Sequence, residues 1–310
     1  MTIPLSQGGL TIERMCALAG VSRAGYYRHW AASAPRVEET AVRDAIQRLA
    51  LAHRHYGYRR IAAQLRREGL AVNHKRVLRL MQQDNLLCLR QKPFVPATTD
   101  SRHGWHVVPN LARGMVPDGL DQLWVADITY IRLQEEFIYL AIVLDAFSRR
   151  VVGWALETHL EARLAIAALS MALEARRPMR DSLIHHSDRG IQYACGDYTE
   201  LLQQHGIAAS MSRVGNPYDN AKAESFMKTL KQEEVDGQTY RDAQQARNAI
   251  GTFIEGVYNR QRLHSALAYR PPAEFEANLR RCGAAAPQPR NAAINSQPVQ
   301  SPQAADLTCP

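Results

Sequence analysis

The spacing of apolar and polar positions changes twice along this chain of 310 residues. Up to about residue 92, apolar side chains recur every three or four positions, which is the period of amphipathic helices. From residue 123, apolar residues form short runs that are typical of strands. Beyond residue 281 the chain is rich in Ala, Pro and Gln and has no aromatic residue, which predicts a disordered tail. The pattern indicates five segments, namely residues 1–35, 36–92, 93–120, 121–280 and 281–310.

The two N-terminal segments each have the layout of a helix-turn-helix. In residues 1–35, Gly20 supplies a turn after a short helical stretch, and Ser22 is a good cap for the next helix. That second helix would present Arg23 and Tyr26 to DNA. A plain helical hairpin fits this piece equally well. In residues 36–92, a break precedes Asn73, which is expected to cap the following helix.

Positive charge is concentrated in the second of these segments. The whole chain carries a net charge of +8, and residues 51–92 alone hold ten Lys or Arg against two acidic residues. Such an excess on two short helices favours contact with DNA phosphates, although a charge run is also compatible with a solvated face. The candidate DNA-binding residues here are Arg59, Arg60, Lys75, Arg76 and Arg79.

Cysteine usage and hydropathy bear on the compartment. The five cysteines are odd in number, scattered and without zinc-binding spacing, so we expect reduced thiols in a cytoplasmic protein. No run of about 18 apolar residues is present, and the N-terminus lacks the pattern of a secretion signal. We therefore expect no membrane partner.

The region from residue 121 to residue 280 predicts an α/β architecture. Residues 93–120, which precede it, are broken by proline and glycine and are expected to be a linker. Three strand-like runs with short links predict an antiparallel meander, and helices then alternate with two further strands. We therefore expect a mixed five-stranded sheet with flanking helices. The predicted strands are residues 123–133, 137–147, 151–157, 183–186 and 207–211, and the predicted helices are residues 161–176, 197–205, 220–233 and 242–259.

Three acidic residues in this region stand in unlike settings. Asp127 lies inside an apolar strand, Asp188 follows another strand, and Glu224 lies on a capped helix. A lone carboxylate in a buried strand is costly unless something neutralises it. If the fold brings the three to one edge of the sheet, they suit Mg²⁺, which prefers oxygen ligands. Two such ions can activate the attacking oxygen and stabilise the leaving oxygen of a phosphoryl transfer.

Other side chains close to these acids are candidates for holding DNA. On a helix, Glu224, Lys228 and Lys231 are spaced by four and three residues and so share one face. With Glu224 at the metal, the two lysines would hold phosphates of the bound DNA. A Glu–Lys pair on a solvated helix is the alternative. Asn216 and Tyr218 precede this helix in a loop that could approach the terminal bases.

Several neighbouring polar residues are given supporting roles. Asp145 is an alternative metal ligand, but its position before a turn favours a structural role. Asp219 is expected to cap the helix of Glu224, with Asn220 helping. His185 and His186 are expected to form structural hydrogen bonds, because two-metal chemistry needs no general base.

These motifs resemble those of a known family. The sequences WVADITY at 124–130, HSDRGIQY at 186–193 and DNAKAESF at 219–226 place 35 residues between Asp188 and Glu224. They look like the D,D-35-E triad of retroviral-integrase-like (DDE) transposases, and are most similar to the OrfB transposase of the insertion-sequence-three family. The resemblance extends over residues 11–280 and includes YNRQRLHSAL at 258–267 and RPP at 270–272.

The resemblance implies an RNase H-like catalytic fold and a DNA transposase that acts on double-stranded DNA. Such an enzyme cleaves at the terminal inverted repeats of its element, and the freed 3′-hydroxyl attacks target DNA. In relatives, two Mg²⁺ or Mn²⁺ ions are held so that Asp127 and Glu224 share one ion and Asp188 bridges both. A homo-oligomer on DNA, an OrfA partner or OrfA–OrfB fusion, and a bacterial nucleoid location are also implied. A metal-dependent nuclease without strand transfer and a non-catalytic DNA-binding regulator remain open alternatives.

Overall fold

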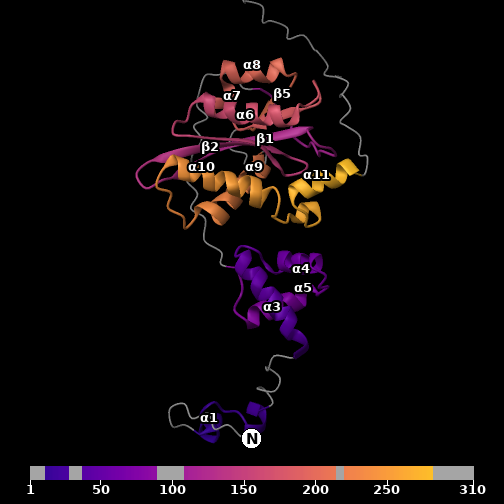
Figure 1. Cartoon of the computed structure of the whole chain (residues 1–310), viewed down its shortest axis with the longest axis vertical. Coiled ribbons are helices and arrows are strands. Elements are labelled where there is room, and N and C mark those ends of the chain that lie inside the picture. The colour runs from indigo at the N-terminus through magenta and orange to yellow at the C-terminus, as the bar shows by residue number, and fades with distance from the viewer. Residues whose placement is uncertain (1–10, 28–36, 89–107, 214–219, 282–310) are drawn as a thin grey trace, which may run out of the picture. The chain divides into compact units, whose positions relative to one another are not determined.

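The computed structural model describes residues 11–27, 37–88, 108–213 and 220–281. The chain forms two compact units, Met1–Arg90 and Gln91–Pro310. Each unit has its own elements, which Figure 1 shows in chain-order colours. They are described separately below.

The first unit begins with the predicted turn. Helix α1 (Ile12–Leu18) is followed by a turn at Gly20, whose φ of +64° is a left-handed conformation that glycine adopts without strain. The hydroxyl of Ser22 then accepts a hydrogen bond of 2.9 Å from the amide of Gly25. Ser22 therefore caps the helical residues 23–27, as the sequence predicts.

Three further helices of this unit surround an apolar core. They are α3 (Val37–Ala52), α4 (Tyr58–Arg67) and α5 (His74–Gln83). The side chain of Asn73 accepts a hydrogen bond of 2.8 Å from the amide of Lys75, which confirms the predicted cap of α5. The apolar faces of α3, α4 and α5 meet in a core made by Ile46, Leu49, Ile61, Leu65, Val77, Leu80 and Met81.

The second unit is built on one mixed five-stranded sheet, as predicted. Its strands are β1 (Leu123–Arg132), β2 (Phe137–Asp145), β3 (Val151–Glu157), β4 (Ile184–Ser187) and β5 (Ala208–Met211). The order across the sheet is β3-β2-β1-β4-β5. The first three strands are antiparallel, and β4 and β5 run parallel to β1. The crossover from β3 to β4 thus places the end of β4 beside the middle of β1.

Helices cover both faces of this sheet (Figure 1). One face carries α6 (Ala162–Arg176), α7 (Ile191–Ala194) and α8 (Gly196–Gln204), and the other carries α9 (Ala221–Leu230), α10 (Ala243–Thr252) and α11 (Pro272–Arg281). Helix α6 packs so closely on β3 that a Cβ on Gly153 would lie 2.1 Å from the carbonyl oxygen of Ala168. Only glycine fits at that contact.

Two of the predicted helices end differently from the prediction. Helices α9 and α10 continue into π-helical turns, η2 (Lys231–Val235) and η3 (Phe253–Tyr258), and a short 3₁₀ turn, η4 (Ser265–Leu267), follows. In η2 the amide of Asp236 bonds the carbonyl of Lys231 at 2.6 Å, five residues back. Apolar spacing cannot distinguish one such widened turn from a continuing α-helix.

The second half of the predicted linker packs on the sheet unit. The amides of Leu111 and Ala112 lie 2.8 and 3.3 Å from the Ser210 hydroxyl oxygen, to which both donate. Residues 93–107 and the predicted tail from residue 282 lie outside the described residues. Within the described segments, no helix is both long and apolar enough to cross a membrane.

Candidate active site

Two of the three predicted acids meet at the junction of β1 and β4. Val125 of β1 pairs with His186 of β4 in parallel register. Asp127 lies two residues beyond Val125 on β1, and Asp188 directly follows the end of β4 at Ser187, close enough for its charge to act on Asp127. The β4 pairing described for β1 stops at Val125, so the edge of β1 is open at Asp127.

The third acid is brought to this edge by a buried amide. The side chain of Asn220 donates a hydrogen bond of 2.9 Å to the carbonyl of Ala126, next to Asp127, and Asn220 is 5% exposed. This contact fixes the start of α9 against β1 and leaves Glu224 exposed in the first turn of the helix. Asn220 forms no side-chain capping bond, so its expected help as a cap is wrong. Asp219 lies outside the described residues.

The electrostatic setting of Asp127 is unfavourable for a charged carboxylate. Burial raises the pKa of Asp127 to about 8, and repulsion from Asp188, with a smaller part from Glu224, contributes to the rise. A 2.9 Å hydrogen bond from the amide of Ile128 and the attraction of Lys231 oppose this only partly. Among the described residues, no cation forms an ion pair with Asp127. Asp127 thus senses the charges of both other acids.

The geometry stops short of a formed metal site. Over the described part of the chain, no group of three or more His, Cys, Asp or Glu side chains is arranged to hold one ion. The chemistry of the donor set nevertheless fits a hard divalent cation, because all three side chains offer carboxylate oxygens. Repulsion between carboxylates is the state that such a cation relieves.

The two predicted DNA-binding lysines, Lys228 and Lys231, have different surroundings. Lys228 is exposed on α9. Lys231 begins the π-helical turn, and its ammonium nitrogen lies 4.8 Å from the ring centroid of Tyr130 on β1. Burial lowers the pKa of Lys231, while Asp236 and Asp127 attract its charge. The amide of Lys231 still bonds the carbonyl of Met227, four residues back, so Lys231 keeps its α-helical spacing from Glu224 and Lys228 and the helix widens only after it.

The two histidines before Asp188 are buried and hydrogen-bonded, as predicted. Burial lowers the pKa of His185 to about 3, and its Nε2 lies 3.0 Å from the Tyr198 hydroxyl. The nitrogens of His186 lie 2.9 Å from the Ser210 hydroxyl and 3.0 Å from the Ser212 hydroxyl. Because Ser210 already accepts two backbone amides, its own proton goes to Nδ1 of His186, and Nε2 carries the ring proton.

Asp145 has the structural role that its position predicts. One oxygen accepts hydrogen bonds from the amides of Phe147 at 3.0 Å and Ser148 at 2.7 Å, and the other accepts from the amide of Asp121 at 2.8 Å. Burial raises the pKa of Asp145 to about 6. With three backbone donors on its two oxygens, the carboxylate holds the turn after β2.

Comparison with known proteins decides the family. Residues 118–217 and 205–272 match families described as Integrase core domain, and residues 37–94 match the HTH-like domain. The chain is 40% identical to the insertion element IS600 uncharacterized 31 kDa protein of Shigella sonnei, covering 84% of this chain and 97% of that protein. It is 35% identical to the transposase InsF for insertion sequence IS3A of Escherichia coli, covering 87% and 95%. The chain belongs to the IS3 family of transposases.

This transposase is an enzyme of the polynucleotidyl transferase type. A solved structure of the simian T-cell lymphotropic virus intasome, in complex with a PP2A regulatory subunit, matches with a TM-score of 0.42 and 13% identity. That match covers 86% of this chain and 80% of the other.

The predicted DNA-binding residues of α4 and α5 differ in their surroundings. Arg59 and Arg60 have their guanidinium carbons 5.6 Å from the ring centroids of Tyr58 and Tyr56 respectively. Lys75 is exposed at the start of α5. Arg76 and Arg79 form ion pairs of 3.3 and 2.7 Å with Glu39 of α3. Their side chains remain 41% and 53% exposed, so part of each guanidinium surface faces solvent.

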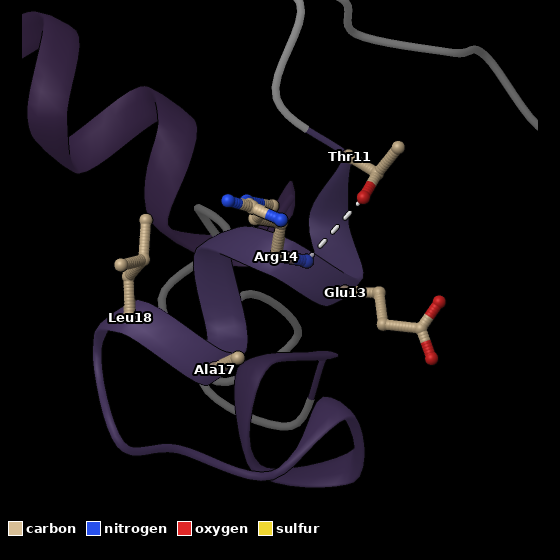
Figure 2. Close-up of a pocket in the computed structure, with 5 residues that line it drawn as sticks. All are labelled: Thr11, Glu13, Arg14, Ala17 and Leu18. Atoms are coloured by element: carbon tan, nitrogen blue, oxygen red, sulfur yellow. Dashed lines mark hydrogen bonds between the residues drawn. The ribbon is translucent and has the colours of Figure 1, made fainter.

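The other predicted contacts lie near α1 or outside the described residues. Arg23 is exposed, and the ring of Tyr26 packs edge-on against Tyr27 with centroids 5.5 Å apart. Asn216 and Tyr218 fall in the undescribed residues 214–219. Figure 2 shows a pocket on α1 that shares no residue with the acidic cluster and is lined by Thr11, Glu13, Arg14, Ala17 and Leu18.

Proposed function

We propose that this transposase cleaves at the terminal inverted repeats of its element and joins the freed 3′-hydroxyl to target DNA. In this proposal Asp127, Asp188 and Glu224 hold two Mg²⁺ or Mn²⁺ ions at the open edge of β1. The observation that carries it is Asp127, a half-buried carboxylate inside an apolar strand that two other acids repel and with which no described cation forms an ion pair. Structural carboxylates in proteins are normally paired, so an unneutralised one favours a binding role.

The chain's own residues would divide the work. Divalent ions, when bound, would activate the attacking oxygen and stabilise the charge on the leaving oxygen in an in-line displacement. Asp127 on β1 and Asp188 after β4 are fixed by strand pairing, whereas Glu224 is exposed on α9 and completes the set. His186 holds the residues around Asp188 through the Ser210 and Ser212 hydroxyls.

DNA contacts are assigned to the basic residues. Lys228 and Lys231 would hold phosphates beside the acids, and the helices α4 and α5 would bind the inverted repeats. The segment boundaries at residues 35, 92, 120 and 280 belong to the same proposal. So do a homo-oligomer on DNA and a partnership with OrfA, as a separate chain or as a fusion.

The test uses the full chain and a duplex copied from the DNA that flanks its reading frame. With Mg²⁺ we expect a nick at the element end followed by a joined product, and both should vanish with EDTA. Glu224→Gln should lose both products and keep binding. Glu157→Gln, which alters an exposed carboxylate at the end of β3, is the matched control.

Each alternative has its own result. Cleavage without any joined product would favour a nuclease and overturn strand transfer. DNA binding without any metal-dependent product, unchanged by Glu224→Ala, would favour a regulator and overturn the enzyme mechanism.

A further inference from the structure

An aromatic cluster lies on the same strand as Asp127. Tyr130 is three residues further along β1, and Phe137 begins β2. Their ring centroids are 5.7 Å apart at an angle of 78°, an edge-to-face contact. Tyr139 lies directly opposite Tyr130 in the antiparallel register, on the same face of the sheet. Phe137 is 48% exposed although its ring contacts that of Tyr130.

Cations flank these rings on two sides. The ammonium of Lys231 lies 4.8 Å from the ring centroid of Tyr130. Arg132 is the cross-strand partner of Phe137 and is exposed. Exposed aromatic rings interleaved with cations are the features that bind unpaired nucleic acid, because bases stack on the rings and phosphates meet the charges.

The exposure and charge around these rings indicate whether Phe137 would contact a base or a phosphate of the DNA. One face of Tyr130 is covered by Lys231, so Phe137 offers the exposed ring. The turn between β1 and β2 carries the exposed residues Glu135 and Glu136, which repel a phosphate. A neutral base is therefore favoured on Phe137, with the phosphate on the side of Lys231.

We propose that Phe137 is a stacking platform for an unpaired base at the reacting DNA end. Tyr130 positions the Phe137 ring and orients Lys231 toward the adjacent phosphate. The inference rests on the proposed function. Tyr130 and Asp127 are three residues apart, so their side chains leave opposite faces of β1, and Lys231 links them: its ammonium lies 4.8 Å from the Tyr130 ring centroid and its charge is attracted by Asp127. Opening the last base pair would expose the scissile phosphate to the acids while the freed base stacks on the protein.

The experiment measures the binding preference of the full chain for an unpaired end. Two fluorescent terminal-repeat duplexes are compared without divalent metal, one fully paired and one with a mismatch at the last base pair. We expect wild type to bind the mismatched end about fivefold more tightly or better, the lower range for one stacked base. Phe137→Leu and Tyr130→Leu should bring this ratio close to one, and Phe137→Trp should keep it.

A matched ring pair elsewhere supplies the control. Phe147 and Phe275 form an edge contact with centroids 5.5 Å apart, so Phe147→Leu removes a similar ring outside the platform and should keep the ratio. A second measurement needs no variant: 5-iodouracil at the mismatched position should crosslink to Phe137 or Tyr130 on irradiation.

The outcomes separate the two proposals. A wild-type ratio near one, a ratio retained in Phe137→Leu, or crosslinks confined to other residues would overturn the platform, even if wild type joins DNA. A preference that depends on Phe137, found in a protein that never cleaves or joins DNA with Mg²⁺, would support the platform and overturn the proposed function.

Discussion

Two carboxylates of the sheet unit, one buried and one half-buried, have opposite electrostatic surroundings. Glu276 of α11 is 1% exposed and accepts a 2.8 Å hydrogen bond from Arg150 and another from Arg176. Burial alone would raise its pKa, yet the charges and hydrogen bonds of these arginines hold that pKa below its usual value. Asp127 has neighbours of its own sign and a pKa raised to about 8.

The difference distinguishes Glu276, a structural carboxylate, from Asp127, the proposed metal ligand. Arg150 follows β2 and Arg176 ends α6, so Glu276 ties the last helix to two distant parts of the sheet unit. Nothing comparable neutralises Asp127 among the described residues. Glu276 receives two arginines and Asp127 receives none among the described residues, which supports the proposal that Asp127 binds a cation from solution.

The largest effect is expected when Asp127 itself is changed. Asp127→Asn keeps the size of the side chain and removes its charge, so strand joining with Mg²⁺ should fall on the order of 10³-fold or more. Because the lost charge is repelled in the folded protein, the free energy of unfolding should stay the same or rise. Gel analysis of joined products and urea unfolding measure the two effects. Retained joining would refute the assignment of Asp127.

Changing Glu276 should lower the stability of the fold and leave the joining activity unchanged. Glu276→Gln leaves two arginines beside a neutral group, and breaking such a buried pair costs about 3 kcal/mol of folding free energy. Joining activity per folded molecule should be unchanged at temperatures where the variant is folded. Glu157→Gln, whose carboxylate is 43% exposed and 3.8 Å from Arg247, is the control and should cost no more than about 1 kcal/mol. Equal losses of folding free energy in Glu276→Gln and Glu157→Gln would contradict the structural role of the buried Glu276 ion pairs.

The same contrast has a dependence on pH. The pKa of Glu276 is lowered in the folded protein, so its carboxylate contributes stability above the ordinary glutamate pKa. That contribution is lost as the pH falls through the lowered folded value. The stability difference between wild type and Glu276→Gln should therefore be full at pH 7 and shrink progressively below about pH 4.5. Urea unfolding along a pH series measures it, and a difference that persists at the acid end would refute the ion-pair explanation.

Much of the fold is predictable because its signals are local. The caps at Ser22 and Asn73 depend on residues within three positions, and strand runs show their period directly. The position of Asp127 inside an apolar strand is also local, so the sequence alone is enough to make it a candidate metal ligand. Family motifs extend the same information to Asp188 and Glu224.

Other features depend on contacts that no short window contains. Glu276 meets arginines 126 and 100 residues away in the sequence, so nothing around it distinguishes it from a surface glutamate. The widening of the helix at Lys231 is equally hidden, because one π-helical turn keeps almost the same apolar spacing. The contact of Lys231 with the Tyr130 ring joins residues 101 positions apart, so the sequence does not predict it either.

The smallest expected effect, a stabilisation by metal, tests the contrast most directly. If the acids around Asp127 bind Mg²⁺, ten times the dissociation constant should stabilise the folded protein by about 1.4 kcal/mol. For a unit of this size that corresponds to a rise in Tm of roughly 3–6 °C. Asp127→Asn should lose the rise in Tm that Mg²⁺ causes. Glu276→Gln should keep that rise from a lower starting Tm, because the arginines beside residue 276 do not bind a cation. A rise in Tm that persists in Asp127→Asn and disappears in Glu276→Gln would contradict the assignment of Asp127 as metal ligand and of Glu276 as structural carboxylate.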